Sequence, residues 1–354
     1  MPRGTVAGAE AGMSGNAASS GEAVRQINWY RVPLAKEKLR ELTRRSDWQG
    51  FLQTVPYLLL LVVTGTASYY AYFHLPLWLF LVILYVHGAF FAFNLNGFHE
   101  LVHGTMFKSK ALNAAFLRIF AFLSWNSHVR FRASHIRHHA STLHPPDDEE
   151  VVLPIRLTVM TWLKCAIVNP LGLFKVLGDF ISQSVGHMRT PWEHTLFPER
   201  DKVARRHLAR WARILLLGHL AIIVVSVATG HWLFAVVTSF ARFYGGGFQW
   251  ICNITQHIGL QDNVPDFRLC CRTIQLNPFL RYLYFQMNWH TEHHMYAAVP
   301  CYNLSKLHDA IAPEMPAISH GLIPAWREIF AISRQQKRDP TYQHVYELPR
   351  PVPT

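Results

Sequence analysis

Residues 51–73 have the sequence FLQTVPYLLLLVVTGTASYYAYF, and residues 76–98 have the sequence PLWLFLVILYVHGAFFAFNLNGF. As a helix rising about 1.5 Å per residue, each run is long enough to cross about 30 Å of hydrocarbon. Only the dipeptide HL separates the two runs, so we expect a tight helical hairpin. Two further apolar runs, at about 212–229 and 232–256, are joined by the equally short GH and predict a second hairpin. The sequence therefore predicts an all-α integral membrane protein with four transmembrane helices.

The composition agrees with a membrane protein. Half of the 354 residues are apolar and 16% are charged, whereas soluble domains carry about a quarter of charged residues. The formal charge of +12 is compatible with nucleic acid, an anionic membrane surface or an anionic partner. The apolar runs favour the membrane, and we expect no nucleic-acid partner. The five cysteines form no CxxC pair, which indicates a reducing compartment.

The basic residues predict how the hairpins are oriented. Eight Lys and Arg precede the first run, sixteen lie between residues 99 and 213, nine follow residue 257, and the short connectors hold none. The positive-inside rule then places both termini and the long middle segment in the cytoplasm of a multi-pass protein, in a bacterial inner membrane or the endoplasmic reticulum. Two shorter apolar stretches, 111–126 and 157–181, are expected to lie on the cytoplasmic face; a full crossing by one of them is the alternative.

The ends of the chain are predicted to flank the membrane domain as tails. Residues 1–24 are small and polar, with no apolar core of a signal peptide, and predict a disordered tail. We place the membrane domain at 25–330 and a C-terminal tail at 331–354.

Histidines gather on the predicted cytoplasmic face, in the motifs HELVH and NITQH at the ends of apolar runs, HIRHH in the middle segment and HTEHH in the C-terminal segment. Their spacings place the histidines of each motif on one helix face. We therefore expect nine imidazoles and one amide to converge: His99, His103, His135, His138, His139, His257, His290, His293, His294 and Asn253. Since one ion takes about four to six ligands, nine histidines predict two metal ions. Imidazole suits iron, copper, zinc and nickel, and a site dominated by neutral histidine favours an iron pair.

Other classes of protein share parts of this pattern. HELVH alone is the motif of zinc proteases, but a protease needs one further ligand and would leave six histidines unexplained. A pH sensor would not repeat the HxxHH spacing. A metal transporter would carry ionisable residues along its spans, whereas here they gather at one predicted face.

The motifs HELVHGT, HIRHH and NWHTEHH, with NITQH before the last, resemble the histidine boxes of the membrane fatty acid desaturase and hydroxylase superfamily. The resemblance covers about residues 50–310. It implies a four-helix stem with a cytoplasmic helical cap that holds a non-haem di-iron centre, which uses O2 to abstract hydrogen from a fatty acyl chain. The nine histidines would be iron ligands, and Asn253 would hold an iron through water. A fatty acid desaturase is the activity we favour; a decarboxylase that forms a terminal alkene, or a hydroxylase, is the alternative.

Carboxylates and one arginine complete the predicted site. Glu100 and Glu292 lie inside the boxes, and the acidic run DDEE, which includes Asp148 and Glu149, follows the second box. Such acids are candidates to hold the second ring nitrogen of a ligand histidine, although a solvated acidic loop also explains the run. Arg242 lies inside the last apolar run, where it would meet a substrate carboxylate or headgroup, or else reach towards the interface.

The chain carries no module of its own for electron transfer. The HPGG signature of a fused cytochrome b5 is absent, so we expect an external carrier, either ferredoxin or cytochrome b5 with its reductase, on the basic face. The first box has three residues between its histidines, where acyl-CoA desaturases usually have four. This departure leaves free acid, acyl-CoA, acyl carrier and acyl lipid all open as substrates.

Overall fold

The computed structural model describes residues 25–159, 162 and 168–349, and it is mostly helical. The tail expected at 1–24 and part of the stretch at 157–181 lie outside the described residues. Within them, the only strands are β1 (Ile274–Gln275) and β2 (Ser319–His320), which pair in parallel. The all-α class is therefore confirmed.

The first hairpin forms as expected. Helix α2 (Asp47–His74) begins at Ser46, whose hydroxyl accepts a hydrogen bond from the backbone N–H of Gln49, and it packs along α3 (Leu77–Ala92). After one residue α3 continues into α4 (Asn94–Val102). In the described part of the chain, three helical stretches are long and apolar enough to cross a membrane: Asp47–His74, Leu77–Val102 and Lys202–Ala228. The number of crossings and their orientation stay predictions.

The second hairpin differs from the prediction. Helix α10 (Lys202–Ala228) is continuous, but the continuous helix expected over 232–256 is wrong. The chain instead forms α11 (Trp232–Thr238), the short 3-10 turn η2 (Ala241–Phe243), α12 (Gly247–Asn253) and η3 (Ile254–Gln256). The break coincides with the glycine run, in which Gly245 has a φ of +74° that side-chain-bearing residues rarely adopt.

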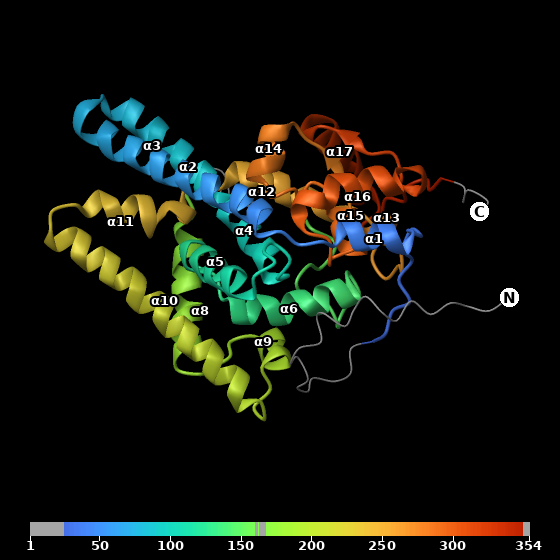
Figure 1. Cartoon of the computed structure of the whole chain (residues 1–354), viewed down its shortest axis with the longest axis horizontal. Coiled ribbons are helices and arrows are strands. Elements are labelled where there is room, and N and C mark those ends of the chain that lie inside the picture. Colours follow the sequence, from blue (N-terminus) through green and yellow to red (C-terminus); the bar gives the residue numbers. More distant parts are fainter. Residues whose placement is uncertain (1–24, 160–161, 163–167, 350–354) are drawn as a thin grey trace.

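The remaining elements pack around the inner end of these hairpins. Figure 1 shows α2–α3 and α10–α11 reaching towards one side, while α6, α13, α15 and α16 lie on the other. Several of these elements begin at a Ser, Thr, Asn or Asp whose side chain accepts a backbone hydrogen bond, which fixes where the helix starts. Their bounds are α1 (Lys36–Leu42), α5 (Lys110–Leu123), α6 (His128–Ser141), α8 (Pro170–Ser184), α9 (Pro191–Leu196), α13 (Phe267–Cys270), α14 (Pro278–Leu283), α15 (His290–Met295), η4 (Cys301–Asn303), α16 (Leu304–Ile311), η5 (Ala312–Glu314) and α17 (Leu322–Arg338).

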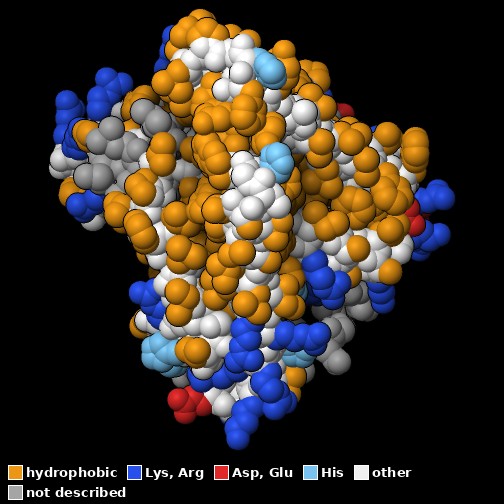
Figure 2. Space-filling view, turned by 90° about the vertical axis from the view of Figure 1, so that its left-hand side faces the viewer, with side chains coloured by type: hydrophobic (Ala, Val, Ile, Leu, Met, Phe, Trp, Pro, Cys, Tyr) orange, Lys and Arg blue, Asp and Glu red, His pale blue; other side chains and the backbone are white. Residues whose placement is uncertain are grey.

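The outer surface of the hairpins is apolar. Figure 2 shows hydrophobic side chains covering most of that face, with Lys and Arg gathered towards its lower edge. Large apolar side chains such as Leu59, Val62, Leu77 and Leu217 are more than half exposed there. A surface this apolar is stable against lipid and costly against water.

The predicted boundary at residue 330 lies inside α17, which continues to Arg338. Beyond it the chain stays bound to the rest of the protein: the backbone N–H of His344 donates to the Gly259 carbonyl at 2.9 Å, and the Tyr346 hydroxyl donates to Glu328 at 2.8 Å. These residues pack beside the segment that carries His257.

Candidate metal centre

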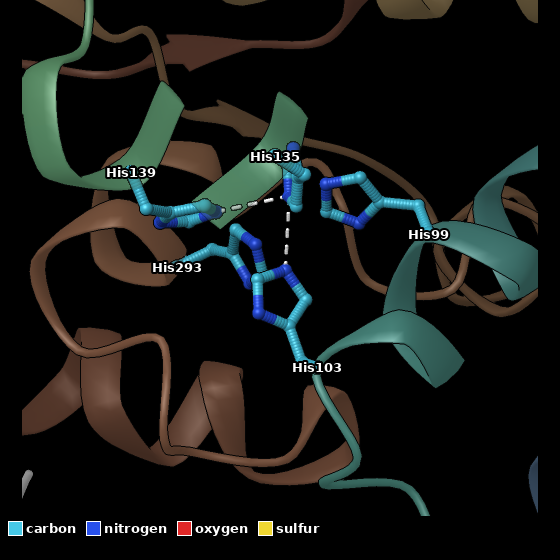
Figure 3. Close-up of side chains that lie close together, drawn as sticks. All are labelled: His99, His103, His135, His139 and His293. Atoms are coloured by element: carbon cyan, nitrogen blue, oxygen red, sulfur yellow. Dashed lines mark hydrogen bonds between the residues drawn. The ribbon is translucent and has the colours of Figure 1, made fainter. Parts of the chain in front are cut away.

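Five of the expected histidines form a first group. His99 and His103 come from the end of α4, His135 and His139 lie one turn apart on α6, and His293 comes from α15. One ring nitrogen from each lies within 4.8 Å of all the others. Figure 3 shows the five rings pointing towards a common space. We call these residues the first group.

A second group lies beside the first. It consists of His257, which follows η3, the thiol of Cys271, and His290 and His294, one turn apart on α15; their donor atoms again lie within 4.8 Å of one another. Nε2 of His290 is 2.9 Å from Nε2 of His257 and 3.1 Å from Nε2 of His294. The short helix α15 joins the two groups, because it contributes one histidine to the first and two to the second.

The ring nitrogens in both groups are arranged as metal ligands. Glu150 lies 2.7 Å from Nδ1 of His135, and the Cys270 carbonyl accepts a hydrogen bond from Nδ1 of His257 at 2.8 Å. A neutral imidazole has one N–H, so each Nε2 carries a lone pair. Nε2 of His135 nevertheless lies 3.0 Å from Nε2 of His103 and 3.1 Å from Nε2 of His139. Lone pairs that face each other at such distances repel unless a cation lies between them. Neighbouring ligands of an ion with bonds of about 2.1 Å would be about 3 Å apart, so the donor set fits a metal.

Burial keeps these imidazoles in the form that binds metal. It lowers the pKa values of His103, His135, His139 and His293 well below the usual value, and like-charged neighbouring histidines lower them further. It also lowers the pKa of His257 to about 3. Neutral imidazole is the metal-binding form, so little free energy is needed to deprotonate these ligands.

Carboxylates hold several of the rings from outside. Asp148 lies 2.8 Å from Nδ1 of His138. Burial lowers the pKa of His138, but Asp148 and Glu150 together outweigh burial and raise it. Glu100 lies 3.2 Å from Nδ1 of His99, and the Glu292 carboxylate binds Nδ1 of His308 at 2.5 Å. Three of the four predicted acids thus contact a histidine. In two of the three contacts the histidine is a predicted metal ligand.

The acidic run does not behave uniformly. Glu149 is exposed, and the structure does not bring it to either group. The neighbouring Glu150 instead binds His135, as described above, and its own backbone N–H donates to Asp148 at 2.9 Å. Asp148 and Glu150 are two residues apart in a segment that is not helical, so their side chains face one side while that of Glu149 faces the other.

Two predicted ligands lie outside both groups. The ring of His138 is centred 5.3 Å from that of His257 and 4.9 Å from that of His294, with its Nε2 left free of the Asp148 contact. Asn253 instead accepts a hydrogen bond from Asn96 at 3.2 Å. The structure thus places His138 beside the second group without including it, and it gives Asn253 a partner on α4.

Sequence reasoning missed Cys271 and His308. The cysteines were used only to indicate a reducing compartment, and His308 lies fourteen residues after the last box without any motif. The adjacent pair Cys270–Cys271 between NITQH and HTEHH was the available signal for Cys271. Its proximity to three histidines depends on tertiary contacts and could not be derived from spacing.

Arg242 lines a cavity of about 210 Å³, together with residues from the inner end of the first hairpin such as Phe91 and Leu95. One of its guanidinium nitrogens, Nη1, donates to the carbonyls of Ser124 and Trp125. Among the described residues no carboxylate pairs with it. Leu95, which also lines the cavity, is one helical turn before His99 and therefore on the same face of α4.

Comparison with protein families identifies the chain. The model of the family described as "Fatty acid desaturase" matches residues 76–326, which include all four histidine motifs. The chain belongs to the fatty acid desaturase family. No curated protein matches it. Family membership indicates a membrane oxidoreductase of the desaturase and hydroxylase type that acts in a lipid context, and the two donor groups are able to bind metal.

Proposed function

We propose that this protein is an O2-dependent, di-iron oxidase that removes hydrogen from an unactivated C–H bond of a fatty acyl chain, as a fatty acid desaturase. The observation that carries the proposal is the pair of adjacent donor groups joined by α15. The first group would hold one iron. His257, His290 and His294, with His138 and with Asn253 through water, would hold the other. When bound, the iron pair supplies reduction of O2 and abstraction of hydrogen from carbon.

The redox balance requires an external electron donor. Desaturation removes two hydrogen atoms from the acyl chain, and reduction of O2 to two waters takes up four electrons in total. The substrate provides two, so a carrier provides the other two together with two protons. We propose ferredoxin, or cytochrome b5 with its reductase, docking on the basic cytoplasmic face where long-range charge attraction raises the association rate.

The residues around the groups have three tasks in this reaction. The carboxylates of Asp148 and Glu150 hold His138 and His135 in one orientation, which keeps Nε2 available. The buried surroundings exclude water from the site. The apolar cavity wall beside α4 would hold the acyl chain near the first group, because a misplaced C–H bond reacts slowly.

Arg242 favours a free fatty acid as the substrate. A half-buried guanidinium that bonds only backbone carbonyls, on the wall of a cavity, would be able to bind an anion such as a carboxylate. A carboxylate held there favours, as a second candidate, oxidative decarboxylation to a terminal alkene. That reaction has the same electron balance, with carbon dioxide as the additional product. Hydroxylation remains the third outcome of the same chemistry.

The proposal is tested by metal analysis and product identification. Purified protein should contain about two irons per chain. Membranes given lauric to stearic acids, O2 and a reductant should convert them with loss of two hydrogens, or of carbon dioxide, only when O2 is present. Zinc at one per chain, without O2-dependent products, would overturn the proposal.

Arg242 has its own test. Arg242→Gln keeps hydrogen-bond donors for Ser124 and Trp125 but removes the charge, so we expect KM for free acids to rise at least about tenfold while turnover of the matching methyl esters changes little. Arg118→Gln, on the exposed face of α5, is the control. Equal effects on acids and esters would exclude a carboxylate at Arg242.

A further inference from the structure

Cys271 has a fixed place beside His257. The carbonyl of Cys270 accepts the hydrogen bond from Nδ1 of His257 at 2.8 Å, and the backbone N–H of Arg272 donates to the Gln256 carbonyl at 2.8 Å. These two bonds lie on either side of Cys271. The peptide that carries the thiol is therefore fastened directly to the segment that carries the histidine.

The same segment is fastened on its other side to the residues that precede His290. Thr273 pairs with Trp289 as an antiparallel bridge, and the backbone N–H of Ile274 donates to the Asn288 carbonyl at 3.0 Å. The side-chain amide of Asn288 returns a bond to the Ile274 carbonyl at 2.9 Å. Cys271 thus lies between the two chain segments that bring His257 and His290 together.

The thiol of Cys271 points into the second group. Its sulfur lies within 4.8 Å of a ring nitrogen of His257, His290 and His294, and the residue is 1% exposed. Its other contact is the sulfur of Cys270 at 3.9 Å, a distance at which a thiol hydrogen bond is weak. The sulfur therefore has the position of a fourth donor to an ion that the three imidazoles would hold.

We propose that Cys271 binds, as a thiolate, the ion held by His257, His290 and His294. The inference rests on the proposed metal centre. On binding, the S–H bond breaks, a sulfur–metal bond forms and the proton passes to solvent, with no change in oxidation state. Thiolate and imidazole together are a common donor set, with sulfur–metal bonds of about 2.3 Å against about 2.0–2.1 Å for nitrogen in zinc sites.

A thiolate would make the two ions chemically unequal. The first group offers only neutral imidazoles, whereas the second would offer one negative charge. The charge stabilises the higher oxidation state of its ion, and the soft donor raises the preference of that position for cobalt and zinc over harder metals. The two positions would therefore exchange metal with different selectivity.

The test uses full-length protein in detergent after its metal has been exchanged for Co²⁺. A thiolate ligand produces an intense sulfur-to-cobalt charge-transfer absorption in the near ultraviolet, which imidazole ligands do not. We expect this band in the unmodified protein and its loss in Cys271→Ser. The adjacent substitution Cys270→Ser is the matched control and should keep the band, because Cys270 holds His257 through its backbone carbonyl.

The outcomes separate this inference from the proposed function. A cobalt protein without the band, or a band that persists in Cys271→Ser, would overturn the cysteine ligand while leaving metal content and product assays intact. If Cys271→Ser does not fold, X-ray absorption of the unmodified zinc-loaded protein decides, since a sulfur neighbour at about 2.3 Å supports the inference and nitrogen alone at about 2.0–2.1 Å excludes it.

Discussion

The two hairpins begin from similar apolar sequences but are built differently. In the first, α2 and α3 are regular and α3 continues almost without interruption to His99. In the second, α10 is regular, but its partner breaks after Thr238 and reaches His257 through η2, the short helix α12 and η3. The break frees backbone groups that a continuous helix would satisfy internally, and the backbone N–H of Asn169 donates to one of them, the Phe243 carbonyl, at 2.7 Å. The break also places Arg242 at the wall of a cavity. Both hairpins line this cavity, and the broken one contributes the only charged side chain that the described residues place there, Arg242.

Each hairpin delivers ligands to a different group, and this division gives the largest expected effect. Removing a first-group ligand with His103→Ala, or a second-group ligand with His257→Ala, should lower product formation at least about a hundredfold, because loss of even an outer partner of a ligand costs 10–100-fold. Metal analysis should show about one ion left in each variant. His320→Ala, at an exposed surface position, is the control. Loss of both ions in both variants would mean that the groups do not bind independently.

The break itself depends on a close approach of two backbones. A Cβ on Gly245 would lie 2.5 Å from the Ala89 backbone nitrogen and 2.7 Å from the Tyr85 carbonyl oxygen, at a φ of +74°. Gly230, in the connector, has a φ of +76° with open space around it. Gly230→Ala should cost only the backbone strain, about 1–2 kcal/mol, whereas Gly245→Ala should cost about 1–3 kcal/mol more from overpacking. Thermal unfolding in detergent measures both, and equal losses would show that the contact with α3 is not tight.

The acidic run offers a smaller and more local comparison. Asp148→Asn keeps the size of the side chain but removes the negative charge beside His138, so metal affinity should fall about 10–100-fold. The exposed neighbour provides the control, since Glu149→Gln should leave affinity unchanged. Competition with a chelator measures the affinity. If the two substitutions weaken binding equally, the run acts through its overall charge and not through the bond to His138.

The sequence was informative where a local pattern determines the structure. Apolar runs predicted α2, α3 and α10, and the i, i+4 spacings predicted that His135 and His139, or His290 and His294, share a face. It failed at 232–256, because hydropathy measures burial and does not register the strain that places Gly245 against α3. It could not predict that Glu150, and not Glu149, contacts a histidine, since a shift of one residue along the chain reverses which side chain faces the site. The position of Cys271 could not be predicted for a similar reason, since its three histidine neighbours come from two other segments of the chain.

The second group should make the stability of the metal-free protein sensitive to acid. The pKa of His257 is lowered to about 3 in the folded protein, against a usual value of 6.5. The folded state therefore binds fewer protons than the unfolded state as the pH falls below 6.5, and stability present above that pH is lost towards pH 3. At pH 5 this group alone costs the metal-free protein about 2 kcal/mol. Thermal unfolding after chelation, at pH 7.5 and 5, should show the loss, and His257→Gln should reduce it while the exposed His320→Gln does not. A second-group variant with an unchanged acid response would indicate that His257 is protonated in the folded protein, and therefore a poorer ligand than those of the first group.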